Sequence, residues 1–166
     1  MFSQNLNQHH YQDLWWVNLG IGVGSMNRDF SYAISFNYYL DNAHLISGRF
    51  AGIQQYTLFS LGGESTNENI YDLGLLYGRL IKSDFGYFSL SGGIGFVGGR
   101  NYTKVTRTYG TEYLEERIST FGLPFEAQLF FTPSDHFGLG FYGFSNFNLE
   151  KNFFGFGFAI QYGELR

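Results

Sequence analysis

Residues 30–40 decide the fold, and they read Phe-Ser-Tyr-Ala-Ile-Ser-Phe-Asn-Tyr-Tyr-Leu. Large apolar or aromatic side chains occupy every even position from Phe30 to Leu40, and small or polar ones fill most odd positions. Successive side chains of a β-strand point to opposite faces. This stretch therefore predicts a strand with one bulky face and one small face.

The same alternation recurs along the chain, in segments of about ten residues separated by turn residues. No internal repeat or linker divides the sequence, and 166 residues are enough for one domain and little more. We therefore predict one domain at 15–166 after a polar segment at 1–14. Its eight strands are expected at 15–24, 30–40, 44–59, 70–81, 87–97, 118–131, 137–147 and 153–163.

The bulky face is too large for the inside of a small barrel. An eight-stranded barrel holds only packed side chains, whereas aromatic residues make up 21% of this chain. The bulky faces must then point outward, and lipid is the medium that tolerates them. No run of about 18 apolar residues exists, which excludes a transmembrane helix. Mean hydropathy is only −0.15, as expected if alternate residues face lipid.

In hydrocarbon an open sheet edge would leave backbone groups unpaired, so the first and last strands should pair. The sequence thus predicts an all-β, closed, eight-stranded antiparallel up-and-down transmembrane β-barrel. Connections after the second, fourth and sixth strands are short, like periplasmic turns, and an even strand count would put both termini in the periplasm. The start shows no secretory signal, so we expect a mature chain; the alternative is a cytoplasmic protein that never had a signal.

Two further features refine this barrel. Pro124 lacks an N–H group, so a bulge or a broken ladder is expected there. Aromatic residues near strand ends predict a periplasmic girdle of Trp15, Trp16, Tyr38, Tyr87, Phe131, Phe137 and Tyr162.

Strand 44–59 is ambiguous in phase, and Arg49 settles the choice. One phase puts Arg49 in lipid, at a cost of about 2–4 kcal/mol, and the other puts it inside. We expect Arg49 inside, within reach of Glu126, with Asp72 nearer the loop end. A lumen charge network of these residues would fill the barrel. A gate or proton-linked site is the alternative.

The last strand carries a recognisable motif. Gly157, Ile160 and Tyr162 fit the glycine-x-x-hydrophobic-x-aromatic assembly signal, and with the strand pattern the chain resembles the small eight-stranded outer-membrane proteins. That resemblance implies an outer-membrane location, contact with lipid and lipopolysaccharide, and the barrel-assembly machinery as a partner during insertion. The aromatic strands and the ending 162–166 also look like outer-membrane proteins of the Bacteroidota.

One possible catalytic motif is incomplete. The outer-membrane lipid A deacylases have a His-x-Ser-Asn segment, and Ser145 and Asn146 match its second half. Gly143 stands at the histidine position, and Gly157 lies where a carboxylate is needed. A serine without a base is a poor nucleophile, so no catalytic residue is predicted.

Segment 98–117 is predicted to be the longest external loop, although its ends could extend the adjoining strands. It mixes charges of both signs with tyrosines, and it could contact lipopolysaccharide, a protein or another surface ligand. Its possible contact residues are Arg100, Tyr102, Lys104, Arg107, Tyr109 and Tyr113.

A net charge of −4 argues against a nucleic-acid partner. No cofactor or metal site is predicted, since cysteine is absent and His9 and His10 have no third ligand. We therefore expect a non-enzymatic scaffold or an accessory subunit of a larger outer-membrane complex. Glycine notches in its outer wall, at Gly48, Gly52, Gly92 and Gly143, could seat a protein neighbour. The alternatives are a deacylase-like lipid A-modifying enzyme, a narrow small-molecule conduit and, more distantly, a soluble lipocalin-type barrel.

Overall fold

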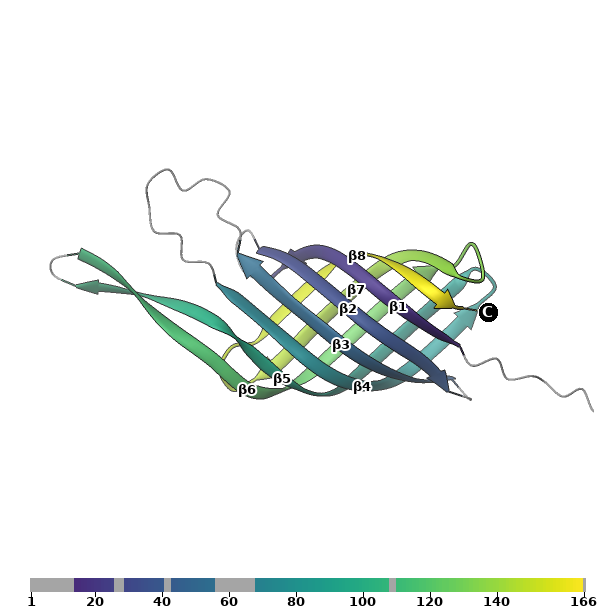
Figure 1. The fold of residues 1–166 in the computed structure, drawn as a ribbon, viewed down its shortest axis with the longest axis horizontal. Helices are drawn as coiled ribbons and strands as arrows, with labels where there is room; N and C mark the ends of the chain where they lie inside the picture. Colours follow the sequence, from purple (N-terminus) through teal and green to yellow (C-terminus); the bar gives the residue numbers. More distant parts are fainter. Residues whose placement is uncertain (1–13, 26–28, 41–42, 56–67, 108–109, 166) are drawn as a thin grey trace, which may run out of the picture.

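The computed structural model describes residues 14–25, 29–40, 43–55, 68–107 and 110–165. At residues 29, 103–107 and 110–113 it describes the backbone alone. Antiparallel strands follow one another in sequence order and close into a barrel through pairing of the first with the last (Figure 1). The strands are β1 (Trp15–Gly24), β2 (Asp29–Leu40), β3 (His44–Gln55), β4 (Asn69–Ser83), β5 (Gly86–Arg107), β6 (Gly110–Phe131), β7 (Phe137–Asn148) and β8 (Phe153–Glu164). The predicted all-β, eight-stranded up-and-down barrel is confirmed.

One predicted loop is wrong. Most of segment 98–117 belongs to β5 and β6, which pair continuously from Gly95–Gly122 out to Arg107–Gly110. Polar residues suggested a loop, but cross-strand backbone pairing extends both strands as a two-stranded hairpin. Residues 56–59, predicted to continue the third strand, lie outside the described residues.

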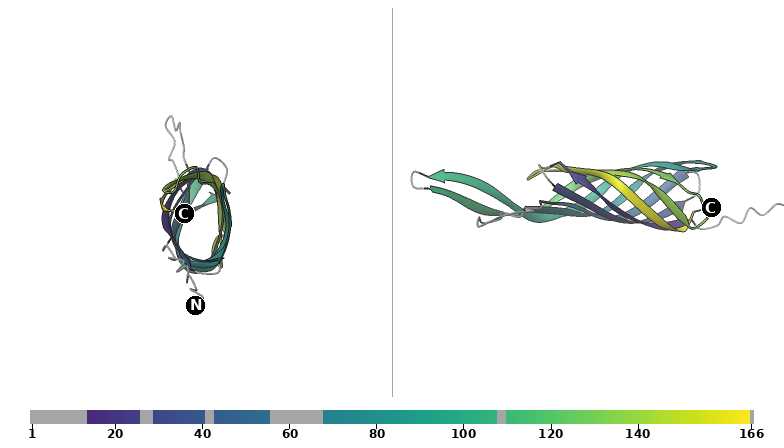
Figure 2. Two further views of the ribbon diagram at one scale, coloured as in Figure 1. Left: turned by 90° about the vertical axis from the view of Figure 1, so that its right-hand side faces the viewer. Right: turned by 90° about the horizontal axis from the view of Figure 1, so that it is seen from above.

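The β5–β6 hairpin projects beyond the rest of the barrel (Figure 2). On the β5 side, the outermost pair with β4 is Asn69–Arg100. On the β6 side, the outermost pair with β7 is Gly122–Asn148. The outer part of the hairpin therefore has two edges without a neighbouring strand among the described residues.

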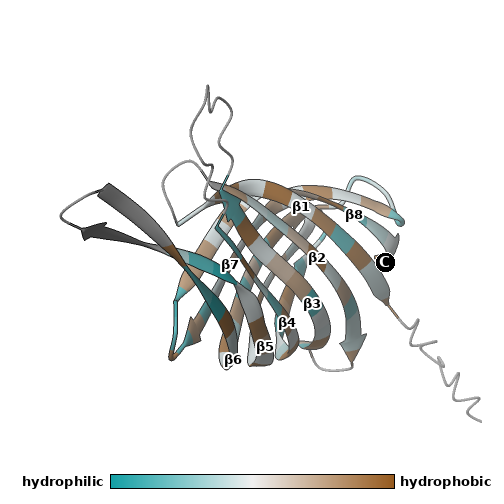
Figure 3. Ribbon diagram, turned by 60° about the vertical axis from the view of Figure 1, so that its left-hand side comes forward, coloured by the Kyte–Doolittle hydropathy of each residue, from teal (hydrophilic) through white to brown (hydrophobic). Residues whose placement is uncertain are grey.

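The two faces of the strands differ in the predicted way. Along β8, Phe154, Phe156 and Phe158 are exposed, while Gly155 and Gly157 are buried. In Figure 3 the hydropathy colours alternate along most barrel strands. No helix in the described part of the chain is long and apolar enough to cross a membrane. An outer wall covered with exposed Phe, Leu and Ile needs an apolar surrounding medium.

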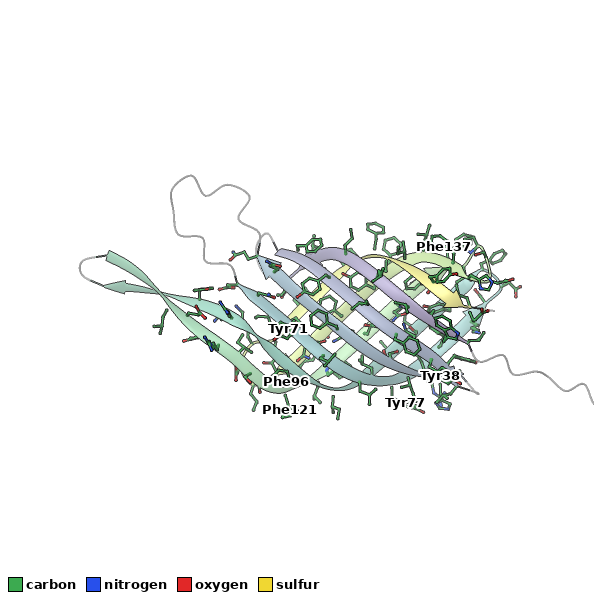
Figure 4. The ribbon with its side chains drawn as sticks, viewed as in Figure 1. Tyr38, Tyr71, Tyr77, Phe96, Phe121 and Phe137 are labelled. Atoms are coloured by element: carbon green, nitrogen blue, oxygen red, sulfur yellow. The ribbon has the colours of Figure 1, made fainter. Side chains whose placement is uncertain are left out.

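Aromatic side chains lie at both ends of the wall and also along its middle, where Phe50 and Phe158 are exposed. Tyr38, Tyr77 and Phe137 lie toward the end with the short turns, and other aromatic residues lie toward the hairpin end (Figure 4). The girdle prediction is wrong for Trp16 and Tyr87. Both point inward, are buried, and pack with ring centroids 5.2 Å apart.

The interruption predicted at Pro124 is present as a broken ladder. The β5–β6 pairing passes from Gly92–Phe125 to Gly95–Gly122 with the register unchanged and the intervening residues unpaired. Because the register is kept, the side chains of β6 on both sides of Pro124 stay in phase.

The closing seam depends on two glycines. Gly22 of β1 faces Gly157 of β8. A Cβ on Gly157 would lie 2.1 Å from the Ile21 carbonyl oxygen and 2.5 Å from the Gly22 Cα. The first and last strands can approach this closely only without side chains at these positions.

Gly157→Ala should lower the free energy of unfolding by about 1–3 kcal/mol, because its Cβ would overlap the backbone of β1. Unfolding in guanidinium, followed by tryptophan fluorescence in lipid vesicles, measures this. Gly48→Ala is the matched control, since its Cβ would meet nothing within 4 Å. Equal stability of the two variants would contradict the role given to the seam.

Candidate functional site

The lumen is centred on Arg49, which is only 1% exposed. Its Nη2 lies 2.7 Å from Asp72 Oδ2, and its Nε donates to Asp72 Oδ1 at 3.3 Å. These two parallel contacts form a bidentate ion pair, the geometry in which arginine holds a carboxylate most firmly. The pair joins β3 to β4 inside the barrel.

Glu126 approaches the same guanidinium from β6. Its Oε2 lies 3.6 Å from Arg49 Nη1, which also donates to the Phe125 carbonyl oxygen at 2.8 Å. The Arg49 guanidinium carbon lies 5.4 Å from the centre of the Phe144 ring. The structure thus brings together Arg49, Asp72 and Glu126, with Asp72 making the shorter contact.

Uncharged side chains extend the network across the lumen. Asn146 donates to Asp72 Oδ2 at 2.9 Å, and Gln128 donates to Glu126. Asn18 donates to Gln128 Oε1 at 2.9 Å. Sequence reasoning did not place Asn146 or Gln128 in the network, although their inward phase was a usable signal.

Two apolar layers enclose these polar groups. The layer at the turn end contains Trp16, Leu45, Leu80, Tyr87 and Phe130, and the layer at the hairpin end contains Ile53, Ile70, Val97, Ile118 and Phe153. Every member of both layers is buried. The lumen is therefore a filled core with an ionic centre.

The partial deacylase motif is divided between the two sides of the wall. Asn146 is fully buried in the lumen, whereas Ser145 lies on the outward face of β7. Ser145 faces Phe125 and Phe154 on the neighbouring strands. Neither neighbour can act as a base for its hydroxyl group.

The described histidines lie at the turn end. His136 Nδ1 is 3.6 Å from Glu164 Oε2, and His44 is hydrogen-bonded to Tyr77. Within the described residues, no three side chains of the types that bind metals gather in one place. His9 and His10 lie outside the described residues.

Two of the predicted loop contact residues form a surface cluster at the base of the hairpin. Arg100 Nε lies 3.6 Å and Arg117 Nε 3.9 Å from Glu115 Oε1, and the Tyr102 hydroxyl donates to Glu115 at 3.5 Å. The side chains of Lys104, Arg107, Tyr109 and Tyr113 lie outside the described residues.

A second polar cluster closes the rim beside the hairpin. Lys151 Nζ lies 3.1 Å from Glu68 Oε2 and 2.6 Å from Asn101 Oδ1. Glu68 also accepts from the Tyr102 backbone N–H at 3.4 Å. No sequence pattern indicated this cluster, because its members come from the β3–β4 connection, the β7–β8 connection and strand β5.

The assembly-signal residues occupy β8 in the expected phases. Ile160 and Tyr162 are exposed on the outer wall, and Gly157 faces inward at the seam. Two of the four glycine notches are covered by the chain itself, because Tyr32 lies over Gly52 and Phe125 over Gly92. Gly48 and Gly143 remain open.

No protein-family model matches the sequence, and no curated protein matches it. Solved structures do resemble the fold. Neisserial surface protein A is similar with a TM-score of 0.61 and 12% identity, over 90% of this chain and 96% of that one. The attachment invasion locus protein Ail of Yersinia pestis is similar with a TM-score of 0.59 and 14% identity, over 91% and 97%.

A third similar structure is the N-terminal β-barrel domain of Pseudomonas aeruginosa OprF, with a TM-score of 0.57 and 13% identity, over 92% of this chain and 99% of that one. At these identities the likeness concerns the fold alone. This chain has the transmembrane fold of the small eight-stranded outer-membrane β-barrels. The Bacteroidota lineage stays a prediction.

Replacing Arg49 by Met should lower the free energy of unfolding by about 3–5 kcal/mol, because Asp72 and Glu126 would stay buried without their cation. The triple variant R49M/D72N/E126Q should recover part of that loss. Urea unfolding in vesicles measures both variants.

The control for Arg49→Met is Arg117→Gln, whose side chain is 83% exposed and which should change stability by less than about 1 kcal/mol. An Arg49→Met protein as stable as the wild type would show that the network contributes nothing to folding.

Proposed function

We propose that this chain is a non-enzymatic outer-membrane barrel that acts as a membrane-embedded scaffold or as an accessory subunit of a larger outer-membrane complex. The observation that carries the proposal is the filled lumen, in which a salt-bridged centre lies between two apolar layers. With no open lumen, the exposed surfaces are left to serve the function.

The same observation argues against the conduit. An ion or solute would have to displace the bidentate Arg49–Asp72 pair and cross both apolar layers. Breaking a buried pair of this kind costs several kcal/mol, and a filled eight-stranded interior has no aqueous path.

The arrangement around Ser145 argues against lipid A deacylation. The serine hydroxyl reaches the lipid side of the wall, but its cross-strand neighbours are phenylalanines and the position two residues before it is Gly143. Serine hydrolysis needs a base within hydrogen-bonding reach.

The β5–β6 hairpin is the surface that we assign to partner contact. It extends past the barrel rim and exposes two strand edges, and an edge strand can pair with an extended segment of another protein. Glu115 and the neighbouring Glu116 offset the charges of Arg100 and Arg117 at its base, so this part of the hairpin does not favour a polyanion. Ail was solved with the heparin analogue sucrose octasulfate, whereas the mixed charges at the base of this hairpin provide no continuous basic surface for such a polyanion.

The orientation belongs to the same proposal. β1 begins and β8 ends at the end of the short turns, where Trp15 pairs with Glu164. We place this end, with segment 1–14, in the periplasm and the hairpin outside the cell. Lipid and lipopolysaccharide would then surround the wall, and the barrel-assembly machinery would meet the signal on β8.

The wild-type protein should show no discrete conductance steps in planar lipid bilayers. Arg49→Ser should be equally silent, because the two apolar layers would still close the lumen. Single-channel recording at high salt tests both proteins, and stepwise currents through the wild type would contradict the filled lumen.

Mild-detergent extraction from native outer membranes should recover the protein at a fixed stoichiometry with a larger partner. A variant with residues 101–116 replaced by a two-residue Asn-Gly turn should lose that partner while keeping its barrel. Gly48→Ala, at an open notch of the outer wall, tests the other predicted contact with a protein neighbour and should keep the partner. A lone species of about 19 kDa would rule out the accessory-subunit role, and retention by the shortened variant would rule out the hairpin as the contact.

A further inference from the structure

A row of outward-facing side chains at the turn end of the wall, next to the aromatic girdle, contains two polar residues, His44 and Arg79. Along β3 and β4, His44 is in register with Arg79. The next pair whose side chains face the outside of the barrel is Ile46 with Tyr77. Tyr38 of β2 continues the second row by pairing with Ile46. Tyr38 and Tyr77 both lie at this end of the barrel in Figure 4.

Arg79 is an exposed cation, and it differs in ion pairing from the other arginines whose side chains the structure describes. Arg49 faces Asp72 and Glu126, and Arg100 and Arg117 face Glu115. In the part of the chain that the structure describes, no carboxylate lies within 4.0 Å of Arg79. Within the described part of the chain, its guanidinium can therefore take an anion from the surrounding medium.

The neighbours of Arg79 identify the medium that supplies that anion. Arg79 pairs across the strands with Leu90, which is exposed, and Ile81 follows it on the same face at 70% exposure. Such side chains need hydrocarbon around them. A cation that borders hydrocarbon at the level of an aromatic girdle lies at the headgroup boundary, where a lipid-facing arginine costs only about 0–1 kcal/mol.

We propose that Arg79, together with His44 and Tyr77, binds the phosphate of an anionic phospholipid on the outer wall of the barrel. The guanidinium presents a planar fork of donors that matches phosphate oxygens. Lys82, the nearest other cation on β4, lies over the Tyr39 ring at 4.6 Å, in the inward phase, and is not part of this site.

Tyr77 fixes the histidine beside the arginine. Its hydroxyl is hydrogen-bonded to His44 Nδ1, and the two rings stack with centroids 5.6 Å apart. When the tyrosine hydroxyl is the donor, the ring proton lies on Nε2, so His44, which is in register with Arg79, offers a second N–H donor. The site thus holds one fixed charge and one oriented donor, and the apolar row of Ile46 and Tyr38 would accompany the acyl chains.

The inference depends on the membrane-spanning fold and is independent of the scaffold role, because it concerns one residue row and makes no use of the hairpin. A barrel that binds anionic lipid without a partner protein would leave this inference intact, and a partner bound by a barrel without lipid preference would leave the scaffold role intact.

Native mass spectrometry of the full chain in detergent tests the site, with phosphatidylglycerol and phosphatidylcholine added in equal amounts. The wild type should retain phosphatidylglycerol over phosphatidylcholine, and Arg79→Gln should lower that preference about fivefold, the effect of one interfacial arginine. Arg79→Lys should keep part of the preference because it keeps the charge. Arg117→Gln removes an exposed arginine at the other end of the barrel and should change nothing.

Every variant should resist unfolding in cold detergent, which shows that its barrel is folded. A lower retention of lipid can then not be attributed to a loss of structure. Equal retention of the two lipids by the wild type, or unchanged preference in Arg79→Gln, would overturn the proposal. Full displacement of phosphatidylglycerol by millimolar inorganic phosphate would also overturn it, since the site would then recognise free phosphate without a need for lipid.

Discussion

The structure depends on one constraint, which is that hydrocarbon offers no hydrogen-bond partner to the backbone. Each strand within the membrane must therefore pair on both sides, and the sheet must close on itself. The Gly22–Gly157 seam meets this need by letting β1 and β8 approach without side chains between them. The interrupted ladder at Pro124 is the local exception, and it is confined to one of the two edges of β6.

The same medium reverses the usual distribution of side chains. Bulky groups face out because lipid accepts them, so the inside receives mainly small and polar residues. A polar interior shut off from bulk water needs internal partners, and Arg49 supplies the central one. Its guanidinium reaches carboxylates of two strands and a backbone carbonyl of β6, so one side chain from β3 connects opposite parts of the wall. The apolar layers on either side keep that centre away from bulk water.

Much of this could be predicted from the sequence, and the reasons differ between elements. Period-2 alternation identified every strand, and the cost of a lipid-facing arginine fixed the phase of β3 around Arg49. Sequence reasoning misread the hairpin because residues such as Lys104 and Glu112 carry no burial signal, and backbone pairing alone makes them strand. Trp16 and Tyr87 were placed in the girdle because large aromatic residues near strand ends usually face lipid, whereas here they fill the lumen. The Glu68–Lys151 contact joins segments far apart in sequence and left no pattern to read.

The length of the hairpin has a consequence for what meets the protein first. Beyond the pair Asn69–Arg100, β5 continues to Arg107, and at about 3.4 Å per residue that distance is roughly 25 Å. In the proposed orientation, the outer part of the hairpin would stand clear of the bilayer while the barrel stays within it. A large body that approached from that side would then meet this short ribbon before it reached the wall.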